Sequence, residues 1–154
     1  MKRKILDYTT DVPVSKTIFE IQNALAEAGA KSILFDYDQQ GQIKAVLFKI
    51  RIPSGQELPF KLPAKVEEAY RVLHGGKSGE WRYKEARMEN AKIVAWRIVK
   101  DWLKAQLAII RLEMAKPEEV FLPYLIVGEN QTLFEKMVQT QFALPSGKKN
   151  DEAR

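Results

Sequence analysis

The residues with the clearest chemical potential are two aspartates at the end of a predicted strand. Asp36 and Asp38 form an Asp-x-Asp pair, and alternate residues of a strand point to the same face. Such a pair can bind a divalent cation when a third carboxylate joins it, here Glu57 on a neighbouring predicted strand. Aspartate also starts many turns, and Asp38 begins a predicted one. A metal-dependent activity at this pair is therefore an alternative to a structural role.

The single histidine, His74, is the other candidate for catalysis. It adjoins a segment with three glycines in six residues, residues 74–79, which predicts a loop. A general base needs an orienting neighbour and a pocket that excludes water, and this loop suggests neither. The chain has no cysteine, which excludes thiolate zinc sites and disulfides. It also lacks phosphate-loop, H-E-x-x-H and G-x-S-x-G motifs. We predict no enzyme, no metal and no cofactor.

The strongest remaining feature is the basic side of a long predicted helix over residues 80–115. A row of cations on a helix can follow a phosphate backbone, at about 1.5 Å per residue. The row consists of Arg87, Asn90, Arg97, Lys100, Lys104 and Arg111. Trp81 and Arg82 lie at its start, where an exposed ring could stack on unpaired bases. The alternative is a solvated polar face, since Lys and Arg are good helix formers.

The distribution of charge also indicates that the long predicted helix is the basic part of the chain. The 154 residues carry a net charge of +5. Residues 74–116 hold ten Lys or Arg and five Asp or Glu, so this segment has the excess of the whole chain. The hydrophobic fraction of 45% and the charged fraction of 29% are ordinary for a soluble globular protein. No apolar run is long enough to span a bilayer or to form a signal peptide. We therefore predict a cytoplasmic protein without a membrane partner.

The periodicities predict an α+β fold: a three-stranded antiparallel meander and a later edge strand, packed against one long and several shorter helices. The meander strands are residues 32–37, 43–52 and 57–62, with Lys49, Arg51 and Lys61 as a second basic patch on its polar face. A leading strand is predicted at 3–8 and the edge strand at 120–127. Helices are predicted at 18–28, 63–73 and 132–141. Capping boxes at Thr17/Glu20, with Ser15 as a competing cap, and at Thr132/Glu135 start the first and last of these helices. Residues 1–143 form one domain, and 144–154 a disordered tail.

The apolar side of the long helix is wider than a two-helix seam requires. One row repeats in a heptad rhythm, and a second row adds Trp96, Val99, Leu103 and Ile110. The heptad row is Met88, Ala91, Ala95, Ile98, Trp102, Ala105, Ile109 and Leu112. We expect Trp102 in the core, and Trp96 either in the core or in a subunit contact. Ala91, Ala95, Ala105 and Ala108 would allow two such helices to pair closely, so a homo-oligomer is a second expectation.

Three segments resemble a group of small proteins encoded in tailed-phage and prophage genomes. They are VSKTIFEIQNALAEAGA, ELPFKLPAKVEEAYRVL and NAKIVAWRIVKDWLKAQLAIIRLEMAKPEEVFLPYLIV. The AWRxxKDWxxAQ run, residues 95–106, is the most specific part, and the resemblance covers most of residues 8–135. It implies a phage or mobile-element origin and supplies no activity. The order of elements is also similar in outline to the core of phage single-strand annealing proteins, an analogy of fold alone.

These observations predict a non-enzymatic nucleic-acid-binding accessory protein of phage or mobile-element DNA replication or recombination. It would act as an oligomer in the host cytoplasm and bind or anneal single strands. The alternative is a protein-interaction module, a host-defence inhibitor or an assembly component, that binds a protein partner through the long helix.

Overall fold

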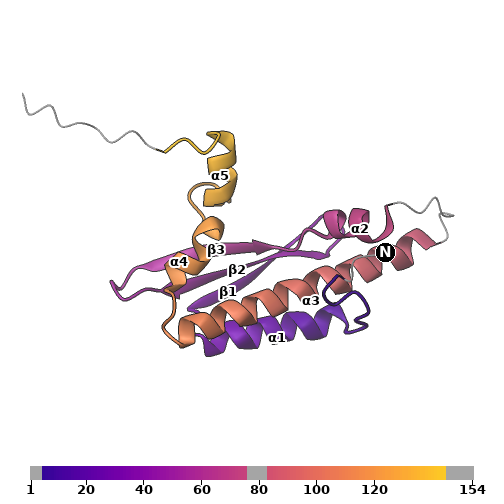
Figure 1. Ribbon diagram of the computed structural model, residues 1–154, viewed down its shortest axis with the longest axis horizontal. Coiled ribbons are helices and arrows are strands. Elements are labelled where there is room, and N and C mark those ends of the chain that lie inside the picture. The colour runs from indigo at the N-terminus through magenta and orange to yellow at the C-terminus, as the bar shows by residue number, and fades with distance from the viewer. Residues whose placement is uncertain (1–4, 76–82, 145–154) are drawn as a thin grey trace, which may run out of the picture.

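Two layers make up the fold: a three-stranded antiparallel sheet, and two long helices, α1 and α3, packed side by side against one of its faces (Figure 1). The computed structural model describes residues 5–75 and 83–144. The strands are β1 (Ser32–Tyr37), β2 (Ile43–Arg51) and β3 (Glu57–Pro63). The helices are α1 (Val14–Glu27), α2 (Val66–His74), α3 (Lys84–Arg111), α4 (Pro117–Phe121) and α5 (Leu133–Gln139), with a 3-10 turn, η2 (Leu122–Tyr124). The predicted α+β class is confirmed.

The predicted meander agrees with the structure to within one residue at every strand end. β2 pairs with β1 on one side and β3 on the other, both antiparallel. Gly41 (φ 74°) and Gly55 (φ 88°) sit in the two hairpin turns, in a backbone conformation that favours glycine. The pairing register shifts between Asp36 and Tyr37. This bulge leaves Tyr37 exposed at the end of β1.

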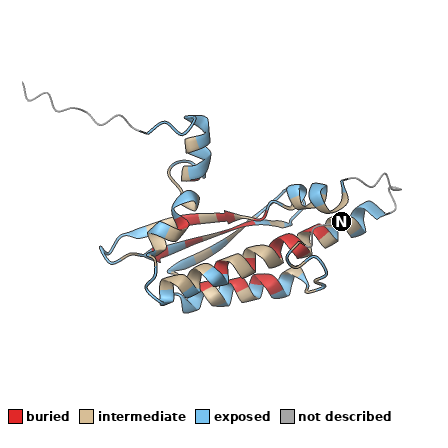
Figure 2. Cartoon of the chain, in the orientation of Figure 1, coloured by how far each residue is buried: buried red, intermediate tan, exposed pale blue. Residues whose placement is uncertain are grey.

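The core lies between the sheet and the pair of long helices (Figure 2). Its aromatic centre is Phe48 of β2, Phe60 of β3 and Phe121 of α4, with ring centroids 5.3 to 5.6 Å apart. The other buried apolar side chains of this core are Ile18, Ile21, Leu25, Val46, Ile50, Leu62, Ala64, Trp96 and Leu103. Each large side chain buried in this way contributes about 1.5–3 kcal/mol of transfer free energy.

α1 starts earlier than predicted, and its predicted capping box is wrong. The helix begins at Val14 after Pro13, with no side-chain cap. Thr17 and Ser15 therefore lie inside the helix, and Thr17 is fully buried. Gly29 (φ 85°) follows the C-cap Ala28 and ends the helix, as the sequence predicts.

In α3 the second apolar row is buried more deeply than the heptad row. Trp96 is 1% exposed and Leu103 fully buried, whereas Ala105 and Leu112 of the heptad row are exposed. A straight helix drifts about 20° per heptad from a 3.5-residue repeat, so a helix on a flat sheet cannot bury one heptad row throughout. Trp96 is a core residue. Trp102 is half-buried, with its ring centroid 6.0 Å from that of Phe121.

Two predicted strands are wrong. Residues 1–4 lie outside the described residues, and from Ile5 the chain forms turns in which Asp7 adopts φ 59°. The apolar run FLPYLIV belongs to α4, η2 and an extended segment that makes only isolated bridges, Phe60↔Leu125 and Ile126↔Thr132. Pro117 at the first helical turn of α4, with two glutamates after it, favours the helix there.

The remaining helices follow the prediction more closely. α2 begins at Val66 instead of Pro63, because Pro63 pairs with Ala45 at the end of β3. The capping box of α5 is confirmed: Thr132 Oγ1 accepts from the Glu135 N–H at 3.2 Å, and the Glu135 carboxylate accepts from the Thr132 N–H at 2.9 Å. Of the predicted tail, residues 144–154, all but Leu144 lie outside the described residues. In the described ranges, no helix has the length and apolar character needed to cross a membrane.

Candidate nucleic-acid interface

The middle of the predicted basic row on α3 is turned inward, towards α1. Arg97 Nη1 lies 2.5 Å from Glu20 Oε2 and 3.5 Å from Thr17 Oγ1. Lys100 is 7% exposed; its Nζ pairs with Asp101 and lies 4.0 Å from Glu20 Oε2. The prediction that these two cations line an exposed face is therefore wrong. They neutralise carboxylates where α1 meets α3. No sequence pattern indicates this pairing, because Glu20 is 77 positions from Arg97.

Asn90 of the row is also occupied within the chain. Its Oδ1 lies 3.0 Å from His74 Nε2, which ties the end of α2 to the start of α3. The His74 ring lies 5.6 Å from that of Tyr70, and its Nδ1 is buried without a hydrogen-bond partner among the described residues. His74 thus has an orienting partner, contrary to the loop predicted around it, since α2 extends through His74.

The rest of the row is more accessible. Lys104 and Arg111 are exposed, and neither forms an ion pair with another described residue. The Arg87 guanidinium lies 5.9 Å from the centre of the exposed Tyr83 ring. Trp81 and Arg82 lie outside the described residues. The structure therefore leaves two exposed cations of the row, Lys104 and Arg111, in the C-terminal part of α3 and the half-buried Arg87 near its start, without a continuous row between them.

The N-terminal turn adds a carboxyl group that the sequence did not suggest. Asp7 Oδ2 is buried and has no N–H or O–H donor among the described residues. Burial first, and then hydrogen bonding to the Asp101 carboxyl and its negative charge, raise the pKa of Asp7. Burial also opposes ionisation of Asp101, but hydrogen bonds from Lys100 and Asp7 and the charges of Lys100 and Arg97 hold its pKa below the ordinary value. The two carboxyls can hydrogen-bond only while one of them holds a proton.

Asp7→Asn is expected to raise the melting temperature at pH 7 and to leave it almost unchanged near pH 3. A raised pKa in the fold means that Asp7 contributes stability below its ordinary pKa, and this contribution is lost as pH rises through the folded value. An amide supplies the missing donor to Asp101 at every pH and tolerates the left-handed backbone of Asp7. Melting curves from pH 3 to 8 measure the effect. Asp11→Asn, an exposed position in the same segment, is the control. A variant less stable than the wild type at pH 7 would contradict the shared proton.

The outer face of the sheet holds the second predicted basic patch. Alternate residues of each strand point away from α1 and α3, and we call this surface the open sheet face. Its members are Leu34 and Asp36 of β1, Leu47, Lys49 and Arg51 of β2, and Glu57, Pro59 and Lys61 of β3. Each of them is exposed or half-buried, which agrees with the predicted partly basic face. Ala45, farther along β2, is the buried residue on this side.

The charges of the open sheet face are partly paired. Arg51 Nη2 lies 2.9 Å from Glu57 Oε1. Lys61 Nζ lies 3.9 Å from Asp36 Oδ2 and 3.3 Å from Asn130 Oδ1. Lys49 is exposed, without an ion-pair partner in residues 5–75 or 83–144. The Arg51–Glu57 pair is exposed and is worth about 0–1 kcal/mol, so a phosphate can displace the Glu57 carboxylate. The side chains of Lys61 and Asp36 are only 15% and 29% exposed.

Asp36 and Asp38, the alternative metal pair, have two other roles. Asp38 Oδ1 accepts the backbone N–H groups of Gln40 and Gln42, both at 2.9 Å, and so closes the first hairpin turn. Asp36 lies between Lys44 and Lys61. The described part of the chain holds no group of three His, Asp or Glu side chains placed to bind a metal. The side chains of Asp36 and Asp38 serve a salt bridge and a turn.

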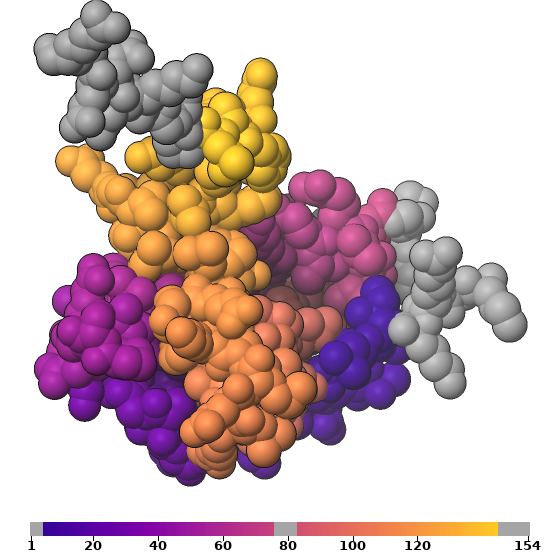
Figure 3. Space-filling model, turned by 60° about the vertical axis from the view of Figure 1, so that its left-hand side comes forward, coloured from indigo at the N-terminus to yellow at the C-terminus, as the bar shows by residue number. Residues whose placement is uncertain are grey.

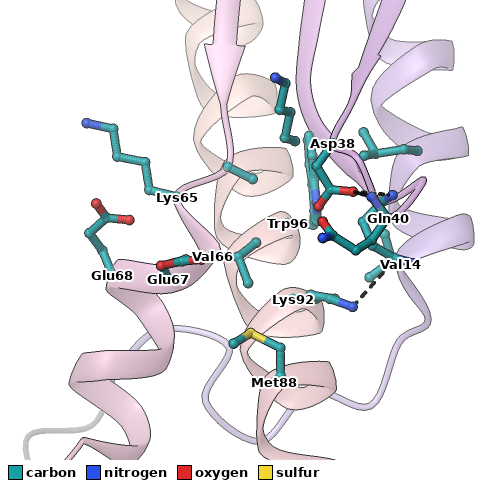
Figure 4. Close-up of a pocket in the computed structure, with 14 residues that line it drawn as sticks. Val14, Asp38, Gln40, Lys65, Val66, Glu67, Glu68, Met88, Lys92 and Trp96 are labelled. Atoms are coloured by element: carbon teal, nitrogen blue, oxygen red, sulfur yellow. Dashed lines mark hydrogen bonds between the residues drawn. The ribbon is translucent and has the colours of Figure 1, made fainter. Parts of the chain in front are cut away.

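A cleft of about 580 Å³ lies between the first hairpin, the start of α2 and the N-terminal half of α3 (Figure 4). Trp96, Met88 and Val66 give it an apolar lining, and Lys92 Nζ lies 3.3 Å from Gln42 Oε1 across it. Three lysines (44, 65 and 92) and three carboxylates (38, 67 and 68) border the cleft. Because these charges balance, the cleft does not extend the basic surface.

The chain was compared with known proteins. No protein-family model matches the chain, and neither a curated protein nor a solved structure matches it.

Proposed function

We propose that the protein is a non-enzymatic nucleic-acid-binding accessory protein of phage or mobile-element DNA replication or recombination, and that it acts as an oligomer. The open sheet face, with Lys49, Arg51 and Lys61, is its primary nucleic-acid contact. The exposed cations of α3 are secondary, because Arg97 and Lys100 are held by Glu20 and Asp101.

The observation that supports this proposal is the contrast between the two faces of the sheet. One face is covered by α1 and α3, whereas the other leaves Lys49 and Arg51 in solvent, with Lys61 half-buried beside them. Lys49 and Lys61 occupy diagonal positions on β2 and β3, since Leu47 pairs with Lys61. Such neighbours lie about 7–8 Å apart, so both ammonium groups can reach phosphates of one strand.

The type of contact follows from the other residues of this face. Leu34 is 59% exposed and Leu47 half-buried, so unstacked bases would meet an aliphatic surface between the cations. None of the residues that make up the open sheet face is aromatic; the nearby rings of Tyr124 and Phe134 belong to a cleft that they line with Lys61 and Pro63. Binding would then be mainly electrostatic, independent of sequence and strongly dependent on salt.

Lys49→Gln/Arg51→Gln/Lys61→Gln is expected to weaken binding to single-stranded DNA at low salt. Glutamine keeps part of the side-chain stem and removes the charge. Three lost phosphate contacts should reduce the slope of log affinity against log salt by about 2, at about 0.7 per contact. Fluorescence anisotropy with a labelled oligonucleotide at several salt concentrations measures both quantities.

The variant for comparison is Lys104→Gln/Arg111→Gln, which removes two of the secondary contacts on α3. The proposal expects a small effect there, whereas an interface on the long helix expects the larger loss. Wild-type protein that binds neither single- nor double-stranded DNA at low salt would contradict the function itself.

A second candidate is the protein-interaction module, although the exposed surface that favours it lies on α5 and not on the long helix, where the sequence predicted the contact. α5 buries none of its residues and exposes Phe134 and Val138. An exposed apolar helix face is a common feature of protein-binding surfaces. Binding of a host or assembly protein through such a surface is compatible with nucleic-acid binding at the open sheet face.

A further inference from the structure

Residues 117–144 form an arm at the C-terminal end of the described chain. The arm starts with α4 against the core, continues through η2 beside β3, and ends with α5, which projects away from the two long helices (Figures 1 and 3). Two hydrogen bonds connect the arm to β3: the Ile126 N–H donates to the Pro59 carbonyl at 2.9 Å, and Lys61 Nζ donates to Asn130 Oδ1 at 3.3 Å. α5 therefore stands beside the domain without entering its core.

The arm carries an apolar patch that has no cover. Phe134 and Val138 lie one helical turn apart on α5, and both are about half exposed. Gln141 and Phe142 adopt positive φ, and the Phe142 N–H donates to the Met137 carbonyl at 2.7 Å. This turn folds Phe142 back, so that its ring lies 6.3 Å from that of Phe134. Phe134, Val138 and Phe142 form what we call the arm patch.

Covering the arm patch would stabilise α5. A helix of seven residues is far below the length at which isolated helices are stable in water, and none of the residues of α5 is fully buried. Burial of three large apolar side chains would contribute more free energy than the capping box does.

The same chain exposes a complementary surface at the end of α3. Lys104, Ala105, Ala108, Arg111 and Leu112 are all exposed, and they fall within about a third of a turn around the helix. We call them the α3 end face. The face has two cations, an exposed leucine and two alanines that let another backbone approach closely. Figure 3 shows the surface of this part of the molecule, with the arm above it.

Charge selects this face as the acceptor. The arm holds four glutamates (118, 119, 129 and 135) and one lysine (136), a net charge of −3 from −4 and +1. The α3 end face has two positive charges and no acidic residue. Both surfaces are exposed in the single chain, so the arm patch does not cover the α3 end face of its own copy.

We propose that the arm patch of one copy docks on the α3 end face of a second copy. Because the two surfaces differ, the contact is head-to-tail and repeats from copy to copy, which produces a closed ring or a filament. The inference rests on the oligomeric state in the proposed function, but it uses neither the open sheet face nor nucleic acid.

Two variants with different defects test the contact. Phe134→Ser/Val138→Ser removes the arm patch, and Arg111→Glu/Leu112→Ser removes the α3 end face; all four residues are exposed. The mass of each protein is measured by light scattering during gel filtration, without nucleic acid, from low to high micromolar concentration. Circular dichroism and the melting temperature show whether each variant is folded. Val72→Ser, at an exposed apolar position on α2, is the matched control.

The wild type and Val72→Ser are expected to exceed the monomer mass of 17.7 kDa, and each double variant to stay monomeric. An equimolar mixture of the two double variants has one intact arm patch and one intact α3 end face. It should therefore form a species of twice the monomer mass and nothing larger. A monomeric wild type, oligomers that persist in either variant, or a mixture that stays monomeric would each overturn the proposal. A monomeric wild type that still binds DNA would leave nucleic-acid binding intact and assign the arm patch to a foreign protein.

Discussion

Glu20→Ala is expected to destabilise the protein by about 3 kcal/mol, the lower end of the range for breaking a buried ion pair. Glu20 accepts from Arg97 at 2.5 Å and lies 4.0 Å from the Lys100 ammonium. The side chains of Arg97 and Lys100 are 18% and 9% exposed, so water cannot fully replace the lost carboxylate. Unfolding by urea, followed by circular dichroism, measures the change.

A double-mutant cycle with Arg97 tests whether the loss of stability at Glu20 comes from uncompensated positive charge. Arg97→Met in the Glu20→Ala background should recover part of the stability, because an apolar side chain has no charge to desolvate. Glu27→Ala, at an exposed position of α1, should change stability by less than about 0.5 kcal/mol. A loss at Glu20 no larger than at Glu27 would show that Arg97 and Lys100 are solvated, and would restore them to the basic surface of α3.

Trp96→Ala is expected to reduce the free energy of unfolding by about 4 kcal/mol. Trp96 is the largest of the fully buried side chains and belongs to the core between the sheet, α1 and α3. Truncation leaves a cavity that the paired strands cannot fill without breaking the register of β2. Denaturant unfolding measures the loss. The slope of the unfolding free energy against denaturant concentration should be the same in both proteins, which indicates that both unfold in two states.

Trp102→Ala on the same helix provides the comparison. Trp102 is half-buried and packs against Phe121 and Tyr124, so about half the effect is expected, near 2 kcal/mol. Leu112→Ala, at a position that is 71% exposed, should have little effect on unfolding. A larger loss at Trp102 than at Trp96 would contradict the described core and favour the heptad row as the buried side of α3.

The same short pattern, Thr-x-x-Glu, occurs twice in the chain and predicts correctly only once. At Thr132 the surrounding chain is extended and both capping hydrogen bonds form. At Thr17 the helix has already begun at Val14, and Glu20 bonds to Arg97 instead. A capping box is a local signal, but it cannot report a charged partner that arrives from another helix.

The prediction of a strand at residues 120–127 is wrong for a related reason. A short continuous apolar segment is consistent with a buried strand and with a buried helical turn, and periodicity cannot separate them. Phe121 packs against Phe48 and Phe60, which pair with each other inside β2 and β3. The residue that packs on these two rings therefore belongs to a helical turn, and the sheet has three strands.

By itself, the sequence determined the meander, the stop at Gly29, the cap of α5 and the location of the long helix. These features depend on residues a few positions apart, whose alternation, turn conformations and hydrogen bonds act locally. Only the tertiary structure decided which basic residues face solvent and which tryptophan is central. Those outcomes depend on the rotation of α3 against the sheet and on the carboxylates of Glu20, Asp7 and Asp101. Burial and pairing of charge are set by residues brought together from distant parts of the chain, and no local pattern contains that information.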